Sequence, residues 1–393
     1  MKNPALKPYC RQVMSRDNDV IRFKMERSTL EIDDPDGSIF AFIRLLDGAR
    51  GVEEIASECR LTAREVEEGL ALLDRHRLLA CGTADPIGLT EREQIRYKNN
   101  LTYFSLYESL NESRFDFQKK LKNATVAVVG LGGGSVIAAW LAAMGVGRIV
   151  GVDFDRVELN NLNRQFFYTE DDVGEYKTIA LQRRLHALNR DVKVEVHQRR
   201  IESAQSLVDI AAEADMMVSA IDTPPLMGSR YVNAACLHRR IPSYYLSIGN
   251  RLGFYFRVLP YESGCTDCRV LHIMRTDPVT AGRIRRQVAG AAADADTGNP
   301  GFAPNVAVMT ALVASDIAKQ LTGYSAISDM PFGLVPFHDM DISRRSIPRY
   351  SDCPSCGRSA DPGTDEWVEP VALERLLEVA EEAAPLSGER ENR

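Results

Sequence analysis

Blocks of apolar and polar residues follow one another along residues 126–165, and their order predicts a strand, a turn, a helix and a second strand. An apolar run over residues 126–129 leads into closely spaced glycines, an alanine-rich segment follows, and a second apolar run over residues 149–152 ends at Asp153. Uninterrupted apolar runs are typical of parallel strands buried on both faces. We therefore expect an α/β fold with a Rossmann-like βαβ unit at this point.

The turn of this unit contains Gly130, Gly132, Gly133 and Gly134. Glycines let the backbone turn tightly and approach a phosphate, while the start of the next helix offers unpaired N–H groups and the positive end of its dipole. Asp153 lies where a carboxylate can hold ribose hydroxyls. The pattern serves NAD, FAD, methyl donors and ATP alike, so a plain NAD-binding fold stays open as an alternative.

Polar and charged residues crowd the exit of the second strand, which reads DFDRVELNNLNRQ over residues 153–165. A dehydrogenase usually has little there beyond its ribose-binding acid. The stretch resembles the ThiF, MoeB and ubiquitin-activating (E1-like) superfamily, whose members adenylate a carboxylate with ATP, and the resemblance extends to about residue 358. It implies an E1-like adenylation fold with ATP and Mg²⁺. The nucleotide contacts that it implies are Gly130, Gly132, Gly133, Gly134, Asp153, Asp155, Asn161 and Gln165.

Three charged residues match the catalytic residues of this superfamily. Arg164, in N-L-N-R-Q, matches the arginine finger, a planar cation suited to charge on the phosphates. Lys177 matches a lysine that also touches the phosphates, and Asp222 matches the aspartate that holds Mg²⁺. Each alone could be a solvated surface charge or a helix cap. Their shared order and spacing favour an ATP site.

One departure concerns the subunit contact. Members of this type often carry R-Y-x-R ahead of the first strand, and the second arginine reaches into the other subunit of a dimer. This chain reads R-Y-K-N over residues 96–99, so Asn99 stands in the place of that arginine. Either Lys98 or Arg114 substitutes for it, or the contact is absent. The resemblance still implies a homodimer.

Two C-x-x-C pairs, Cys265 with Cys268 and Cys353 with Cys356, lie far apart in the sequence. The two-residue spacing lets both thiolates of a pair bind one tetrahedral Zn²⁺. The same pairs occur in ThiF and MoeB relatives, so we expect a structural Cys₄ zinc clip. A redox dithiol or a disulfide framework fits poorly in a large chain without a signal peptide. The remaining cysteines lack the context of a catalytic thiol, and they are Cys10, Cys59, Cys81 and Cys236.

Composition narrows the class of protein. With 393 residues and 45% apolar content, the chain can bury a sizeable core, as two domains or as one large and one small domain. The net charge of −7 argues against a partner among nucleic acids. No apolar run is long enough to span a membrane. A cytoplasmic enzyme of bacterial type is the simplest expectation.

The first 81 residues do not belong to the adenylation fold. We expect strands over residues 20–25 and 28–32, helices over 38–46, 52–59 and 62–75, and a returning strand over 78–80. This is the order of a small winged helix, and it resembles the PqqD-like element that holds a leader peptide as an added strand. The alternative, a DNA-binding winged helix, lacks a basic face on its third helix.

The other segments complete the domain plan. A linker is expected over residues 82–98, the adenylation domain with its zinc site over 99–358, and an acidic tail over 359–393. Within them we expect helices over 109–121 and 304–321, a mobile loop over 275–301, and an amphipathic run over 371–383 that either docks or stays loose.

A peptide-recognition module fused to an adenylation domain resembles the pantocin A and microcin C7 adenylating enzymes. We therefore expect ATP-dependent activation of a carboxylate on a ribosomally made precursor peptide, in antibiotic (RiPP) biosynthesis. The departure at Asn99 and the G-G-S turn over residues 133–135 favour activation of a glutamate side chain, followed by intramolecular condensation. Alternatives are adenylation of the peptide C-terminus as in microcin C7, a MoeB-like sulfur-carrier adenylyltransferase, a leader-binding scaffold for a partner cyclodehydratase, and a transcription regulator.

Overall fold

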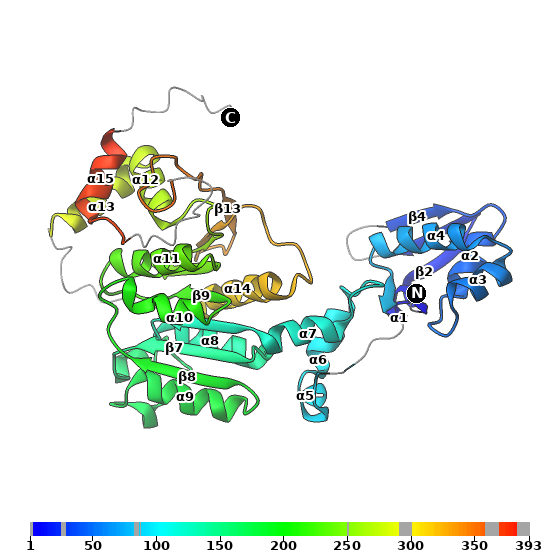
Figure 1. The fold of residues 1–393 in the computed structure, drawn as a ribbon, viewed down its shortest axis with the longest axis horizontal. Helices are drawn as coiled ribbons and strands as arrows, with labels where there is room; N and C mark the ends of the chain where they lie inside the picture. The colour runs from blue at the N-terminus through cyan, green and yellow to red at the C-terminus, as the bar shows by residue number, and fades with distance from the viewer. Residues whose placement is uncertain are drawn as a thin grey trace. The chain divides into compact units, whose positions relative to one another are not determined.

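The structure is a computed structural model that describes residues 3–24, 29–81, 86, 88–249, 251–290, 301–357 and 369–382. The chain divides into two compact units (Figure 1). Unit 1 comprises residues 1–121 and 321–326, and unit 2 comprises residues 122–320 and 327–393. The domain limits expected from the sequence, at residues 81, 98 and 358, stay predictions.

Unit 1 contains an antiparallel sheet of order β2-β3-β4 and a separate antiparallel pair, β1 with β5. Its strands are β1 (Pro4–Leu6), β2 (Met14–Asp17), β3 (Val20–Lys24), β4 (Thr29–Asp33) and β5 (Leu79–Cys81), and its helices are α1 (Pro8–Val13), α2 (Ser38–Arg44), α3 (Val52–Cys59), α4 (Ala63–Arg75), α5 (Glu91–Arg96), α6 (Lys98–Ser105) and most of α7 (Arg114–Asn123). The order of elements from β3 to β5 agrees with the sequence pattern. The pattern did not predict β1, α1 and β2. Strand β2 is mostly exposed and lacks the apolar alternation by which a strand is predicted.

Helix α4 shows why the pattern was informative in this unit. Thr62 caps it: its hydroxyl accepts from the N–H of Glu65 (3.2 Å), and the Glu65 carboxylate accepts from the N–H of Thr62 (2.7 Å). Val66, Leu70 and Leu73 recur every three or four residues and are buried in the core of the unit. Cap and apolar stripe therefore agree on the start and the buried face of this helix.

The expected linker contains a helix of its own, α5, so its description as a polar linker was incomplete. Thr90 and Glu93 form the same reciprocal cap, with the Glu93 N–H donating to the Thr90 hydroxyl (3.2 Å) and the Thr90 N–H donating to the Glu93 carboxylate (2.7 Å). The helix expected over residues 109–121 begins only at Arg114, since Ser113 and Asp116 cap it there.

Unit 2 is built on one eight-stranded mixed sheet of order β13-β12-β11-β10-β9-β6-β7-β8, in agreement with the expected α/β fold. Strands β8, β7, β6, β9 and β10 are parallel, and β11, β12 and β13 continue the sheet in antiparallel fashion. The strands are β6 (Thr125–Val129), β7 (Arg148–Asp153), β8 (Lys193–Gln198), β9 (Met216–Ser219), β10 (Ser243–Ile248), β11 (Leu252–Val258), β12 (Phe332–Pro336) and β13 (Ser343–Arg345), and the helices are α8 (Gly133–Met144), α9 (Lys177–Leu188), α10 (Val208–Ala212), α11 (Met227–Arg239), α12 (Thr266–Thr276), α13 (Pro278–Val288), α14 (Ala303–Thr322) and α15 (Leu373–Glu382).

Helices cover both faces of this sheet (Figure 1). The four residues of β6 from Val126 to Val129 are all fully buried, which explains why the strand reads as an uninterrupted apolar run. Ala127 and Val129 belong to a core that includes Val232 and Cys236 of α11. The long apolar helix expected over residues 304–321 is α14.

The expected mobile loop over residues 275–301 was wrong in its first part, which forms helix α13. Asp277 caps this helix, because its carboxylate accepts from the N–H groups of Val279 (3.1 Å) and Thr280 (3.0 Å). Ala281 and Ile284 are buried on one face. The composition suggested a loop because it is rich in arginine and glycine. Residues 291–300 lie outside the described residues.

The amphipathic run near the C-terminus forms α15, which docks on the body. Leu376 and Ala380 are buried in the same core as helix α12. Arg275 donates a hydrogen bond to the carbonyl of Val379 (3.2 Å), and Arg285 pairs with Glu381 (3.1 Å). The rest of the expected tail, residues 359–368 and 383–393, lies outside the described residues. None of the described helices has the length and apolar character needed to cross a membrane.

A buried lysine in unit 1 yields a stability prediction. Lys7 is 1% exposed, and its ammonium donates to the carbonyls of Arg77 (2.8 Å), Leu106 (2.9 Å) and Glu108 (2.9 Å). Replacing Lys7 by Met leaves these carbonyls without their donor, so we expect a loss of about 3 kcal/mol in the free energy of unfolding. Denaturant unfolding of the full chain measures it.

The matched control is Lys24→Met, which removes an exposed lysine from β3. It should change the free energy of unfolding by no more than about 0.5 kcal/mol. Equal stability of Lys7→Met and the unmodified chain would contradict the prediction.

Candidate active site and metal centre

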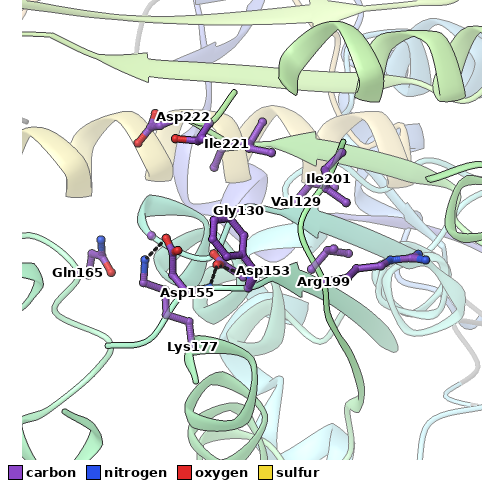
Figure 2. Close-up of a pocket in the computed structure, with 15 residues that line it drawn as sticks. Val129, Gly130, Asp153, Asp155, Gln165, Lys177, Arg199, Ile201, Ile221 and Asp222 are labelled. Atoms are coloured by element: carbon purple, nitrogen blue, oxygen red, sulfur yellow. Dashed lines mark hydrogen bonds and ion pairs between the residues drawn. The ribbon is translucent and has the colours of Figure 1, made fainter. Parts of the chain in front are cut away.

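The ends of three neighbouring parallel strands meet in unit 2. Strand β6 lies between β7 and β9. The chain passes from β6 to β7 on one side and later returns to β9 on the other side of β6. Such a reversal of strand order is the switch point at which ligands bind in open parallel sheets. A first pocket opens at this place (Figure 2). It is lined by Val129, Gly130, Gly132, Val152, Asp153, Phe154, Asp155, Gln165, Lys177, Arg199, Ile201, Ala220, Ile221, Asp222 and Thr223.

A second pocket adjoins the first, because four residues, Gly132, Gln165, Ala220 and Asp222, line both. Its other lining residues come from the start of α8, the turn that carries Arg164, the end of β10 and the segment around the start of α14. They are Gly133, Arg164, Leu246, Ser247, Ile248, Gly301 and Val306. The structure therefore brings all three residues predicted to be catalytic to one continuous cavity.

The glycines of the turn after β6 have different structural roles. Gly130 has φ +88°, and a Cβ on it would lie 2.5 Å from the carbonyl oxygen of Ala220, so only glycine fits. A Cβ on Gly133 would meet nothing within 4 Å, which leaves its backbone open to a ligand at the start of α8. Gly134 lines neither pocket and packs against Val128, where a Cβ would lie 2.8 Å from a methyl group.

Asp153 is 8% exposed and already binds the protein backbone. One carboxylate oxygen accepts from the N–H of Leu131 (2.6 Å), and the other accepts from the N–H groups of Phe154 (2.7 Å) and Asp155 (2.8 Å). Asp153 thus holds the glycine turn onto β7, and a ribose hydroxyl would use its remaining lone pairs.

Asn161, another predicted nucleotide contact, lines neither pocket. Its side-chain oxygen accepts from the backbone N–H of Glu158 (3.2 Å).

The two predicted cations flank the cavity. Lys177 is 7% exposed. Its side-chain ammonium pairs with the carboxylate of Asp155 (3.2 Å), and its backbone N–H donates to the backbone carbonyl of Asp155 (2.9 Å). Arg164 donates to the Asn160 carbonyl (2.8 Å) and the Asn163 side chain (2.9 Å). In Figure 2, the pair of Lys177 and Asp155 lies across the pocket from Asp222.

Asp222 follows the end of β9 by three residues rather than closing the strand itself. Loss of solvation inside the cavity raises the pKa of its carboxyl group, and the positive charges of Lys177 and Arg164 oppose this shift. Asp153 and Asp155 add to the rise. A divalent cation would be attracted by these carboxylates and would favour the ionised form of Asp222, so Mg²⁺ fits here.

Gln165 provides an independent sign of a ligand. Its side-chain oxygen is buried and has no hydrogen-bond partner among the described residues, yet the side chain lines both pockets. A buried polar group without a partner costs about 1–3 kcal/mol. A ligand group that donates a hydrogen bond to this oxygen where the two pockets meet would satisfy it.

The structure also places residues at the site that the motif did not predict. Arg199 and Ile201 follow the end of β8, and the Arg199 N–H donates to the Asp153 carbonyl (3.0 Å). Ser247 comes from the end of β10. The rule that parallel strands end on one edge could have found them, but the short strands β8 and β10 were not assigned from the sequence.

Arg114, one of the two suggested substitutes for the missing arginine, has another partner, and two cysteines outside the C-x-x-C pairs are buried. Arg114 pairs with the buried carboxylate of Glu108 (2.7 Å and 3.1 Å), which holds it within unit 1. Cys236 is 1% exposed and Cys10 is fully buried, and burial raises the pKa of both thiols. Neither has the environment of a reactive thiolate.

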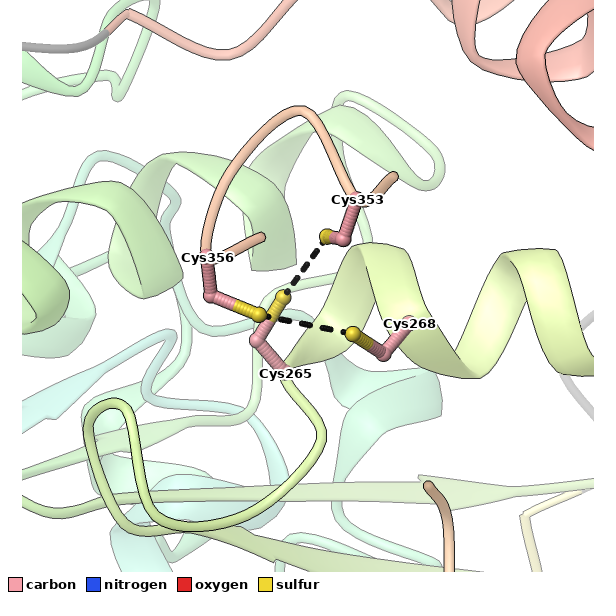
Figure 3. Close-up of side chains that lie close together, drawn as sticks. All are labelled: Cys265, Cys268, Cys353 and Cys356. Carbon is pink, nitrogen blue, oxygen red and sulfur yellow. Dashed lines mark hydrogen bonds between the residues drawn. The ribbon is translucent and has the colours of Figure 1, made fainter. Parts of the chain in front are cut away.

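The four cysteines of the C-x-x-C pairs converge (Figure 3). All are buried, and their sulfur atoms lie within 4.8 Å of one another. The sulfurs of Cys265 and Cys353 are 3.6 Å apart, and those of Cys268 and Cys356 are 3.4 Å apart. A tetrahedron with Zn–S bonds of about 2.3 Å has sulfur–sulfur edges of about 3.8 Å. The donor set and its compact geometry therefore fit a structural Zn²⁺.

Known proteins resemble this chain in sequence and in fold. The sequence model of the ThiF family matches residues 104–357. The sulfur carrier protein ThiS adenylyltransferase of Escherichia coli K12 is 32% identical over 284 residues, which cover 70% of this chain and all of that protein. The sulfur carrier protein adenylyltransferase of Thermus thermophilus is 34% identical over 249 residues, or 61% of this chain and 84% of that protein.

Solved structures extend the likeness in fold across most of the chain. Crystal structures of E. coli MccB include one with a TM-score of 0.71 at 22% identity, covering 90% of this chain and 97% of that one. Another contains ATP, with a TM-score of 0.67 at 21% identity, over 90% and 99% of the chains. The crystal structure of PaaA has a TM-score of 0.62 at 21% identity, over 86% and 98% of the chains.

The cysteine cluster yields a prediction of metal content. The purified chain should contain about one zinc ion, and Cys268→Ser should lose it together with a large part of the stability, because a structural zinc contributes folding free energy directly. Elemental analysis and thermal unfolding measure the two effects.

Cys236→Ser is the matched control, since it changes a buried cysteine outside the cluster. It should keep the full zinc content. Zinc-free wild-type protein, or a disulfide among the four cysteines, would refute the assignment.

Proposed function

Since this chain belongs to the ThiF family, we propose that it uses ATP to adenylate a carboxylate of a ribosomally made precursor peptide. The observation that carries this proposal is the meeting of an open glycine turn, two cations and a desolvated aspartate at two adjoining pockets. In this proposal the first pocket binds the nucleotide, and the second pocket admits the carboxylate that attacks it.

The lining residues suggest how the substrates lie. Asp153, Arg199 and Ile201 would contact the ribose and base in the first pocket. The phosphates would pass the shared residues near Gly132, where the N-terminus of α8 favours negative charge. The acceptor carboxylate would then approach from the second pocket, past Ser247.

The reaction needs no nucleophile from the protein. A carboxylate oxygen of the peptide attacks the α-phosphorus of ATP and forms the O–P bond, while the bond to the β-phosphate oxygen breaks and pyrophosphate leaves with the electron pair. Arg164 and Lys177 offset the charge that gathers on the leaving group. Asp222 would hold Mg²⁺, which supplies further charge compensation on the phosphates.

A precursor peptide is the acceptor that best explains the whole chain. MccB, which the fold resembles, has been crystallised with the peptide MccA, and the fold likeness covers unit 1 as well as unit 2. Among carboxylates, we favour a glutamate side chain followed by intramolecular condensation, and C-terminal adenylation is the alternative. The sulfur carrier protein of the ThiS and MoeB type remains a second candidate, because the sequence relatives act on such proteins by name.

Unit 1 offers a surface for the leader peptide, in keeping with a PqqD-like element. Strand β4 is an edge strand of the β2-β3-β4 sheet, and Leu30 and Ile32 alternate with exposed residues along it. An extended leader could add as a further strand there, with its backbone supplying hydrogen bonds and alternate side chains supplying selection. We also propose a homodimer, for which exposed Leu159, Phe166 and Val173, in the same stretch of sequence as Arg164, offer apolar surface.

Replacement of Asp222 tests the chemistry. Asp222→Asn keeps the side-chain volume but removes the charge that would hold Mg²⁺, so release of AMP and pyrophosphate should fall by about 100-fold or more. In the unmodified enzyme, turnover should rise with pH through the raised pKa of Asp222, above the ordinary value near 3.9, because the ionised form binds the cation.

The matched control is Asp209→Asn, which removes an exposed carboxylate from α10 in the same unit. It should turn over ATP and the cognate precursor at the rate of the unmodified enzyme. Unchanged turnover in Asp222→Asn would remove Asp222 from the mechanism.

The leader proposal predicts a pattern with a period of two. Proline substituted along the leader should weaken binding at alternate positions, where the N–H is lost to the ladder, more than alanine does. Fluorescence anisotropy with labelled precursor measures this. Equal effects of proline and alanine at every position would speak against strand addition.

A further inference from the structure

The two cysteine pairs share a contact that their metal chemistry does not require. Asp267 lies between Cys265 and Cys268, and Ser355 lies between Cys353 and Cys356. The Ser355 hydroxyl donates to the carboxylate of Asp267 (2.7 Å), so the inner residues of both pairs meet.

One of these inner residues, Asp267, also binds an arginine outside the cluster. The Arg230 guanidinium donates to the two carboxylate oxygens of Asp267, from Nε at 2.6 Å and from Nη2 at 3.0 Å. The side chain of Arg230 is 2% exposed and that of Asp267 is fully buried. A bidentate pair of this kind fixes direction as well as distance, because the planar guanidinium matches the carboxylate.

Arg230 belongs to the first turn of α11, directly after the segment that carries Asp222. Gly228, two residues earlier, packs on the side chain of Ile221, where a Cβ would lie 3.0 Å from a methyl carbon. Ile221 immediately precedes Asp222 in the sequence. The Asp267–Arg230 pair, the backbone of the first turn of α11 and the packing of Gly228 on Ile221 therefore connect the cysteine pairs to the residue beside Asp222.

The segment between β9 and α11 does not hold its shape by local preference alone. Leu226 has φ +62°, a left-handed value that a leucine rarely adopts. Such a conformation persists only where the surroundings fix both ends. At one end the Ala220 N–H donates to the Val129 carbonyl (2.8 Å), and at the other end Arg230 is bound to Asp267.

We propose that Arg230 is a positioning residue, which transfers the fixed geometry of the two cysteine pairs to Asp222. The inference rests on the proposed function, in which Asp222 holds Mg²⁺. Under it, the cluster determines where the cation sits as well as closing the C-terminal segment onto the sheet. A purely structural ion pair would stabilise the fold without any specific effect on the cation.

The test compares ATP binding with and without Mg²⁺ in the full-length chain by isothermal titration calorimetry. The readout is the Mg²⁺-dependent gain, defined as the ratio of the two dissociation constants. Arg230→Met should lower this gain by about 10-fold, the lower end of the range for loss of a direct partner of a metal ligand, because Arg230 acts on Asp222 through the backbone. Binding of ATP without Mg²⁺ should change little. Arg230→Lys keeps the charge but not the bidentate contact and should give an intermediate loss.

Two reference variants separate positioning from stability. Arg257→Met removes another buried arginine of the same unit, which lies on β11 and donates to the Ser328 carbonyl (2.9 Å). This variant should keep the gain. Ser355→Ala removes only one hydrogen bond to Asp267 and serves if Arg230→Met fails to fold. It should lower the gain measurably, with zinc content unchanged.

The outcomes decide between the two proposals. A lost gain in Asp222→Asn and Arg230→Met, with a retained gain in Arg257→Met, supports the inference. If Asp222→Asn loses the gain but Arg230→Lys keeps it in full, and either Ser355→Ala or Arg230→Met also keeps it in full, the inference is wrong. The proposed function then still stands. A full gain in Asp222→Asn overturns the proposed use of Asp222 and this inference with it.

Discussion

The site depends on the close approach of two backbone segments at Gly130. A side chain there would collide with the Ala220 carbonyl at 2.5 Å, so the glycine is what allows the turn after β6 to touch the segment after β9. That contact sets the open turn at Gly133 against Asp222, on the same edge of the sheet. The other side chains proposed to be catalytic reach this edge because β6, β7 and β9 are parallel neighbours and all end there.

Charge within the cavity is arranged before any substrate binds. Lys177 is held by Asp155, Arg164 is held by oxygens of its own turn, and Asp222 is desolvated between them. Groups fixed by such contacts need little reorganisation when negative charge develops on a leaving pyrophosphate, which is how electrostatic preorganisation lowers a barrier. The cost is a set of polar atoms without partners, of which the Gln165 oxygen is the clearest.

The sequence predicted most of the central unit because its signals are local. The apolar run of β6, the glycines and the C-x-x-C spacing each require specific residues at fixed intervals, and the structure places them accordingly. What it missed depends on tertiary contacts. Helix α13 has the composition of a loop and forms because one face packs and Asp277 caps it, while Arg199 joins the site only through the pairing of β8 with β7. Asn161 and Gly134 match the motif, yet their positions serve turn closure and packing.

The lining of the second pocket bears on how a peptide substrate would be selected. Among the described residues that line the second pocket alone, Arg164 is the only cation, and Leu246, Ile248 and Val306 are apolar. Arg164 is needed for the phosphates under the proposed function, so little charge is left to attract an acceptor carboxylate. Affinity for the precursor must then come from contacts distant from the reacting atoms, and binding energy gained on a leader segment can position the carboxylate for attack. Under the proposed function, the edge strand in unit 1 would supply such contacts without adding a positive charge that would make the attacking oxygen less nucleophilic.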